Sequence, residues 1–147
     1  MLKTILYSLL FSTVAIMALE TGDSVPKNIQ EKLKLESDKV YVVDFFASWC
    51  KSCKKELPLI SNIYNKKIAQ VVGVNVDKNR EDGEKMVKEL ELPFPIVYDT
   101  NKNLVEAFNP IGFPAVYYIK NGQILNVIFG AVEEIDKKIA EDIKAIK

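Results

Sequence analysis

The chain of 147 residues contains no histidine. This absence excludes Ser-His and Cys-His catalysis, and histidine-held metal centres, within the chain. Only two cysteines are present, which are too few for a disulfide-rich scaffold or a four-cysteine zinc site. Six glycines and six prolines are too few for a collagen-like or linker-like chain.

The charge balance gives the chain no preference for a polyanion. Twenty basic residues stand against twenty acidic ones, so the formal net charge is zero and we expect no nucleic-acid partner. Hydrophobic residues make up 48% of the chain and charged residues 27%, which indicates a folded globular protein rather than a disordered one. A chain of this length accommodates one domain.

The first 18 residues differ from the rest. Lys3 gives the start a positive charge, a mostly apolar stretch runs to Ala18, and polar residues return at Glu20. The apolar stretch is shorter than the roughly 20 residues that span a bilayer, and the layout is typical of a secretory signal peptide. We therefore expect a signal peptide over residues 1–18, cleaved near Ala18, with an uncleaved membrane anchor as the alternative. Export would bring a cysteine pair into an oxidising compartment.

Apolar periodicity predicts alternating strands and helices after a lead-in that contains one short helix. Strands are expected over residues 40–46, 71–76, 94–98, 115–119 and 123–129, and helices over residues 50–67, 81–90, 104–108 and 132–146. Pro58 should kink the first of these helices, and Pro95 limits the third strand to an edge or a strand start. Asn121 and Gly122 form a hairpin signal between the last two strands. The order predicts an α/β fold with its sheet covered on both faces.

Cys50 and Cys53 directly follow the first predicted strand and begin the next helix. A helix start supplies unpaired N–H groups and the positive end of the helix dipole, and both stabilise a thiolate. We therefore expect an exposed Cys50 as the attacking nucleophile and Cys53, one turn inward, as the resolving thiol. A structural disulfide and half of a metal site are the alternatives. The former would close only a small loop, and the latter would need ligands from a second chain.

Residues 45–58, with the sequence FFASWCKSCKKELP, resemble the active-site region of the thioredoxin superfamily, and most closely its exported TlpA/ResA-type thiol-disulfide oxidoreductases. The resemblance continues through residues 74–77, 94–99 and 112–114. It implies a thioredoxin fold, with a central mixed β-sheet flanked by helices and an extra strand–helix insertion before a cis-proline at Pro114. The domain implied in this way covers residues 40–147 and follows the lead-in, residues 19–39.

The resemblance also implies roles for individual residues. Cys50 and Cys53 match the redox pair, and Pro114 matches the cis-proline that lies against it. Phe113 would then present its backbone to the substrate, and Trp49 would flank the site, with core packing as the alternative for Trp49. No organic cofactor and no metal is needed, because the electrons reside on the two sulfurs.

Two carboxylates are candidate proton acceptors for Cys53. Glu56 shares a helix face with Cys53 and matches the active-site glutamate of the ResA-like branch, although a solvated helix carboxylate is its alternative. Asp44 falls inside an apolar strand, where burial would raise its pKa, and it matches the buried aspartate of thioredoxin. The lysine that pairs with that aspartate in thioredoxin is missing, because Gly73 occupies the nearest position. We favour Asp44 as the main acceptor, with Glu56 as a second contributor.

The dipeptide between the cysteines departs from the family pattern, in which proline is common at the second position. Here Lys51 and Ser52 would stabilise a Cys50 thiolate by charge and by a hydrogen bond, which makes the disulfide more oxidising. Lys51, Lys54 and Lys55 also form a basic rim, which is either a solvated face or a surface that selects the partner.

The resemblance implies an exported reductase of protein disulfides, fed by a membrane thiol electron donor in a periplasmic or otherwise extracytoplasmic bacterial compartment. By family analogy its substrates include apocytochrome c, in cytochrome c biogenesis. A general oxidase or isomerase of secreted proteins stays open. A copper-binding thioredoxin-fold chaperone is an alternative that the missing histidine disfavours. A thiol peroxidase would need a cysteine in a threonine-bearing loop, and neither cysteine has that setting.

Overall fold

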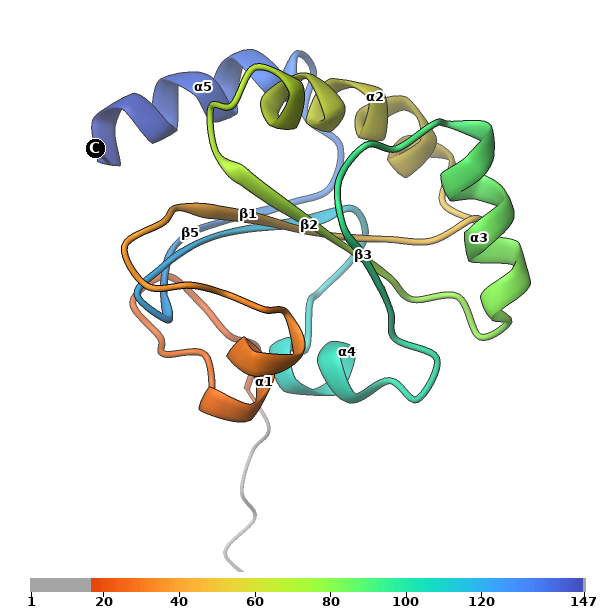
Figure 1. Ribbon diagram of the computed structural model, residues 1–147. Helices are drawn as coiled ribbons and strands as arrows, with labels where there is room; N and C mark the ends of the chain where they lie inside the picture. The colour runs from red at the N-terminus through yellow and green to blue at the C-terminus, as the bar shows by residue number, and fades with distance from the viewer. Residues whose placement is uncertain (1–16, 147) are drawn as a thin grey trace, which may run out of the picture.

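The computed structural model describes residues 17–146 and shows a sheet with helices on both faces (Figure 1). In chain order the elements are α1 (Lys27–Lys32), β1 (Tyr41–Phe46), α2 (Lys51–Asn65), β2 (Gln70–Asn75), α3 (Arg80–Glu89), β3 (Ile96–Tyr98), α4 (Asn103–Phe108), β4 (Ala115–Lys120), β5 (Gln123–Phe129) and α5 (Ile135–Ile146). Every expected strand and helix is present, with ends that differ by a few residues. The predicted signal peptide, residues 1–18, lies almost entirely outside the described residues. Within residues 17–146, none of the helices combines the length and apolar composition needed to cross a bilayer.

The sheet is mixed, as a thioredoxin fold requires. Its strand order is β3-β2-β1-β4-β5, with β1, β2 and β3 parallel and with β4 and β5 antiparallel to their neighbours. The short strand β3 lies at an edge, in agreement with the prediction from Pro95. β1 is central and buried along its whole length, because helices cover both faces of the sheet. The insertion between β2 and Pro114 contains α3, β3 and α4.

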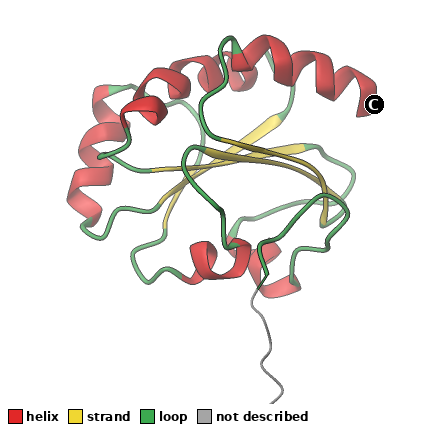
Figure 2. Cartoon of the chain, turned by 180° about the vertical axis from the view of Figure 1, so that it is seen from behind, coloured by secondary structure: helices red, strands yellow, loops and turns green. Residues whose placement is uncertain are grey.

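The helices form two layers. In Figure 1, α2 and α5 lie on one side of the sheet and α1 and α4 on the other, and Figure 2 shows the same layers from behind. The spacing of the α5 isoleucines predicts one apolar stripe formed by Ile135, Ile139, Ile143 and Ile146; the first three are buried and Ile146 is half-buried. On the opposite face, the Phe45 ring packs against the Phe108 ring of α4, with centroids 5.0 Å apart. The core therefore lies on both sides of β1, and the loop after β1 emerges at one end of the sheet.

The hairpin between β4 and β5 is formed by the predicted turn residues. Asn121 and Gly122 both have positive φ, at 52° and 71°, as the type I′ turn of a two-residue hairpin requires. The lead-in runs beside this hairpin, where the Gly22 N–H donates a hydrogen bond of 2.8 Å to the Ile124 carbonyl. The lead-in thus pairs with the start of β5, an outer strand of the sheet.

Candidate active site

Cys50 and Cys53 are joined by a disulfide at the N-terminus of α2. Cys50 caps the helix, and its Sγ accepts a hydrogen bond of 3.2 Å from the Cys53 N–H. The same Sγ lies 3.5 Å from the Ser52 hydroxyl, as the sequence led us to expect. Hydrogen-bond donors and the positive end of the helix dipole both favour negative charge on a sulfur. The position of Cys50 therefore suits a thiolate.

The expectation that Cys50 is exposed is wrong in this oxidised form. Cys50 is only 7% exposed, and Cys53 is completely buried. In this form the Cys50 sulfur is bonded to the sulfur of the buried Cys53, within the first turn of the helix. Cys50 nevertheless lines an open groove, together with Trp49 and Ser52.

The groove beside Cys50 has a volume of about 810 Å³. One of its walls is the first part of α2, which contributes Glu56 and Leu59, and the other is the segment of residues 131–134 between β5 and α5. Leu59 and Val132 give it apolar surface, and the buried Glu56 borders it. Lys51, Lys54 and Lys55 of the basic rim are all exposed. The groove thus joins the disulfide to a buried acid.

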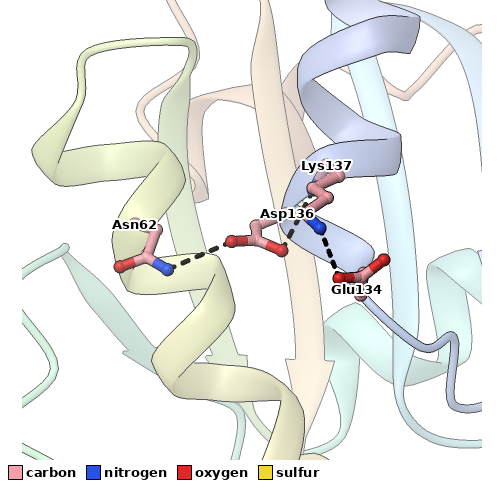
Figure 3. A network of polar contacts seen from close by, with 4 residues as sticks. All are labelled: Asn62, Glu134, Asp136 and Lys137. Carbon is pink, nitrogen blue, oxygen red and sulfur yellow. Dashed lines mark hydrogen bonds and ion pairs between the residues drawn. The ribbon is translucent and has the colours of Figure 1, made fainter.

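A polar cluster holds the two walls of the groove together (Figure 3). Asn62 of α2 donates a hydrogen bond of 3.1 Å to the Asp136 carboxylate at the start of α5. Asp136 also accepts a hydrogen bond of 3.0 Å from the Lys137 N–H, and the Lys137 ammonium pairs with Glu134. The start of α5 is therefore linked to α2 through Asp136, and Glu134, the last residue of the 131–134 segment, is paired with α5.

The loop before β4 contacts Trp49, the residue that precedes Cys50. The peptide bond between Phe113 and Pro114 is cis, as expected. The Phe113 ring meets the Trp49 ring edge to face, with centroids 5.8 Å apart. Trp49 is 64% exposed, which excludes core packing as its role. Two aromatic rings, one from each loop, therefore stand beside the cysteine pair.

Asp44 and Glu56 are both buried, so the solvated alternative for Glu56 is wrong: Glu56 is only 4% exposed. Among residues 17–146, no group forms a regular hydrogen bond with any of their carboxylate oxygens. Burial raises the pKa of Asp44 well above its usual value, and the charge of Glu56 raises it further. Burial raises the pKa of Glu56 to about 7, and the nearby Val132 backbone N–H offsets part of the rise. The described residues hold no group of three or more acids or cysteines arranged to bind a metal.

Asp77, for which the sequence pattern suggests no role, lies beside the redox loop, residues 47–50, which leads to Cys50. Asp77 is 3% exposed, and its carboxylate accepts hydrogen bonds from both the N–H and the hydroxyl of Ser48. One signal could have found it: Asp77 follows the end of β2, and the carboxyl ends of neighbouring parallel strands meet at one edge of a sheet.

Comparison with known proteins gives matches over most of the chain. A model of the AhpC/TSA family matches residues 19–128. Thiol-disulfide oxidoreductase ResA of Geobacillus kaustophilus is 30% identical over 125 residues, which are 82% of this chain and 71% of that protein.

Solved structures show the same architecture. A protein from Chlorobium tepidum described as thiol:disulfide interchange protein DsbE is 25% identical, with a TM-score of 0.74, and the match covers 87% of this chain and 98% of that one. StoA from Bacillus subtilis is 26% identical, with a TM-score of 0.65, and the match covers 72% of this chain and 83% of that one.

The mixed sheet, the cystine at the start of α2 and the cis-proline loop define a class, the thiol-disulfide oxidoreductases with a thioredoxin fold. Its relatives carry names of the same class. The chain belongs to the AhpC/TSA family within the thioredoxin superfamily and is a thiol-disulfide oxidoreductase of the ResA/StoA type.

Proposed function

We propose that the protein is an exported reductase of protein disulfides. The observation that carries the proposal is the position of Cys50, which caps α2 and lines an open groove while it is bonded to the buried Cys53. A structural cystine would have no need of such a groove, and a disulfide that closes so small a loop adds little stability.

The reaction is a pair of thiol–disulfide exchanges. The Cys50 thiolate attacks one sulfur of the substrate disulfide, and the other substrate sulfur leaves as a thiolate that takes up a proton. Cys53 then loses its proton and attacks the Cys50 sulfur, which releases the second substrate sulfur as a thiol. The substrate gains two electrons and two protons, and the enzyme is left with the Cys50–Cys53 disulfide. A membrane thiol donor returns the enzyme to its reduced form.

Asp44 and Glu56 carry the proton of Cys53. Cys53 is completely buried, so its proton needs an acceptor inside the protein. Asp44 takes the proton, and Glu56 passes it to solvent, because Glu56 lines the groove while its charge acts on Asp44. A pKa of about 7 suits Glu56 to this exchange near neutral pH.

Trp49, Phe113 and Pro114 present the substrate to Cys50. Trp49 offers an exposed aromatic face, and the Phe113 ring packs against its edge. The cis peptide bond turns the Phe113 backbone at the start of β4, beside the redox loop. A substrate segment would lie along this backbone, with its cysteine over the Cys50 sulfur.

The substrate class that we propose is apocytochrome c, whose haem-attachment cysteines must be reduced. The ResA name of the curated relative and the signal-peptide pattern of residues 1–18 support a reductase that acts outside the cytoplasm. Lys51 and Ser52 favour the thiolate and so a more oxidising disulfide, which keeps a general oxidase or isomerase as the second candidate.

One comparison of rates tests this proposal. The reduced mature chain is mixed with an oxidised apocytochrome c peptide that carries both haem-attachment cysteines, and with an oxidised secreted protein as the matched control. We expect faster reduction of the peptide. Equal rates would indicate a general reductase, and oxidation of reduced proteins by the disulfide form would indicate an oxidase. Tight, stoichiometric binding of Cu(I) without disulfide turnover would indicate a copper chaperone.

A further inference from the structure

We propose that Asp77 is a positioning residue that holds the turn before α2, residues 47–50, so that Cys50 stays aligned with the N–H groups of the helix start. The inference deepens the proposed function and rests on it for the role of Cys50 as the attacking thiol. The observation behind it is a series of contacts that joins β2 and α3 to this turn.

The Asp77 carboxylate has three hydrogen-bond donors around it. The Ser48 N–H donates to Oδ2 at 2.9 Å, the Ser48 hydroxyl donates to Oδ1 at 2.7 Å, and the Asn75 amide donates to Oδ2 at 2.7 Å. Asp77 is 3% exposed, so these bonds are shielded from water. Both polar groups of Ser48 that can donate are therefore committed to one buried carboxylate.

Ser48 sits inside the turn that delivers Cys50. The Cys50 N–H donates a hydrogen bond of 3.1 Å to the Ala47 carbonyl, which closes the turn. Trp49, the other central residue of the turn, is 64% exposed and cannot anchor it by burial. Besides the contact between the Trp49 and Phe113 rings, the hydrogen bonds to Asp77 tie the middle of the turn to the body of the protein.

The two residues that precede Asp77 are themselves restrained by contacts with other elements. Asn75 is completely buried, and a Cβ placed on Gly83 of α3 would overlap its side-chain oxygen, so the two elements are in close contact. The Lys102 ammonium donates to the Val76 carbonyl, directly before Asp77. Contacts with β2, α3 and the start of α4 therefore restrain the backbone that carries the Asp77 carboxylate.

The turn controls the chemistry of Cys50 through geometry. Cys50 accepts the Cys53 N–H only while the residue stays in its place as the helix cap. When the turn loosens, the thiolate loses part of that stabilisation and the pKa of the Cys50 thiol rises. A purely structural role for Asp77 would lower the stability of the fold and leave this pKa unchanged.

The test uses Ser48→Ala, which removes one of the three hydrogen bonds, with Ser48→Thr as the rescue that keeps the hydroxyl. Ser61→Ala is the matched control, because the Ser61 hydroxyl donates to the Leu57 carbonyl farther along α2. Each reduced protein is alkylated over a range of pH, and the labelled cysteine is identified by mass spectrometry. In Ser48→Ala we expect the midpoint for Cys50 to rise by about half a pH unit or more. Ser48→Thr and Ser61→Ala should keep the midpoint of the unaltered protein.

An unchanged midpoint in a folded Ser48→Ala protein would overturn the proposal, whatever happens to stability. Asp77→Ala is the stronger variant, because it removes the acceptor of all three hydrogen bonds. If Asp77→Ala folds, its midpoint should rise further than that of Ser48→Ala. Failure of the proposed function looks different: in that case the unaltered protein itself would show no preferential labelling of Cys50 over Cys53.

Discussion

Gly73 of β2 lies directly opposite Asp44 of β1 in the parallel ladder. A Cβ on Gly73 would lie 2.7 Å from Cδ1 of Ile96 and 2.9 Å from Cε1 of Phe46, so this position has no room for a side chain. The lysine that the thioredoxin resemblance would place near Asp44 is therefore absent, and the side chains of Ile96 and Phe46 occupy the space beside this position. Glu56 is the charged neighbour that acts on Asp44 instead.

Replacement of Gly73 by alanine should destabilise the protein. Glycine inside a strand is ordinarily destabilising relative to alanine. Here, however, the added methyl group overpacks the core and lowers the free energy of unfolding by about 1–3 kcal/mol. Urea unfolding of the oxidised protein measures the change. Gly112→Ala is the control, because a Cβ there would have no atom within 4 Å. If Gly73→Ala were as stable as the control, the close approach at Gly73 would be refuted.

Glu56 should make the oxidised protein less stable as the pH rises. The pKa of Glu56 is about 7 in the folded protein and about 4.5 as a free side chain, so between these values the folded state holds more protons. The free energy of unfolding therefore falls as the pH rises through this window, by about 3 kcal/mol as an upper bound. Below it, both states are protonated and the contribution of Glu56 is fully present.

Urea unfolding at a series of pH values checks this dependence. In Glu56→Gln the fall in stability between about pH 4.5 and pH 7 should become shallower, and the double variant with Asp44→Asn should flatten it further, because Asp44 also has a raised pKa. A slope in Glu56→Gln equal to that of the unaltered protein would contradict the burial of Glu56.

The proton relay predicts a slower resolving step without Asp44. When Asp44→Asn is mixed with substrate, release of the mixed disulfide by Cys53 should slow by about a hundredfold, as expected for loss of a general base. Glu56→Gln should instead shift the pH dependence of that step, because Glu56 connects the relay to the groove. Rapid-quench mass spectrometry of the mixed disulfide measures both. Glu133→Gln, an exposed carboxylate of the same groove, is the control and should change neither.

Trp49 should matter for protein substrates more than for small ones. Because Trp49 is 64% exposed, Trp49→Ala should change the free energy of unfolding by no more than about 0.5 kcal/mol. The lost ring removes contact area for a protein partner, so KM for a protein disulfide should rise several-fold. The rate with a small aromatic disulfide reagent serves as the internal control. An equal loss with both substrates would assign Trp49 to the chemistry at Cys50 rather than to docking.

Local signals predicted much of the fold and part of the site. Three features are visible in short stretches of sequence, and the structure confirms them: the apolar run of β1, the Asn121-Gly122 turn and the isoleucine stripe of α5. The burial of Asp44 was also predictable from local sequence, because helices cover both faces of a central strand and a side chain on either face is buried.

Other features depend on contacts between distant parts of the chain. Glu56 is buried where α2 faces residues 131–134. Its position along the helix does not reveal this contact, which is why a solvated carboxylate was left open as the alternative. Cys50 is buried in the oxidised form, in which its sulfur is bonded to that of the buried Cys53, and helix position does not specify this burial. Asp77 and Ser48 are 29 residues apart in the chain and meet only because β1 and β2 are parallel neighbours.

The most direct test of the central claim uses Cys53→Ala in its reduced form. This variant keeps the attacking Cys50 and lacks the thiol that would resolve the mixed disulfide. After it is mixed with a disulfide-bearing protein, peptide mapping by mass spectrometry should find a persistent adduct on Cys50, and Cys50→Ala should form little or none. The account would be contradicted if Cys53→Ala trapped no partner, or if Cys50→Ala trapped partners on Cys53 equally well.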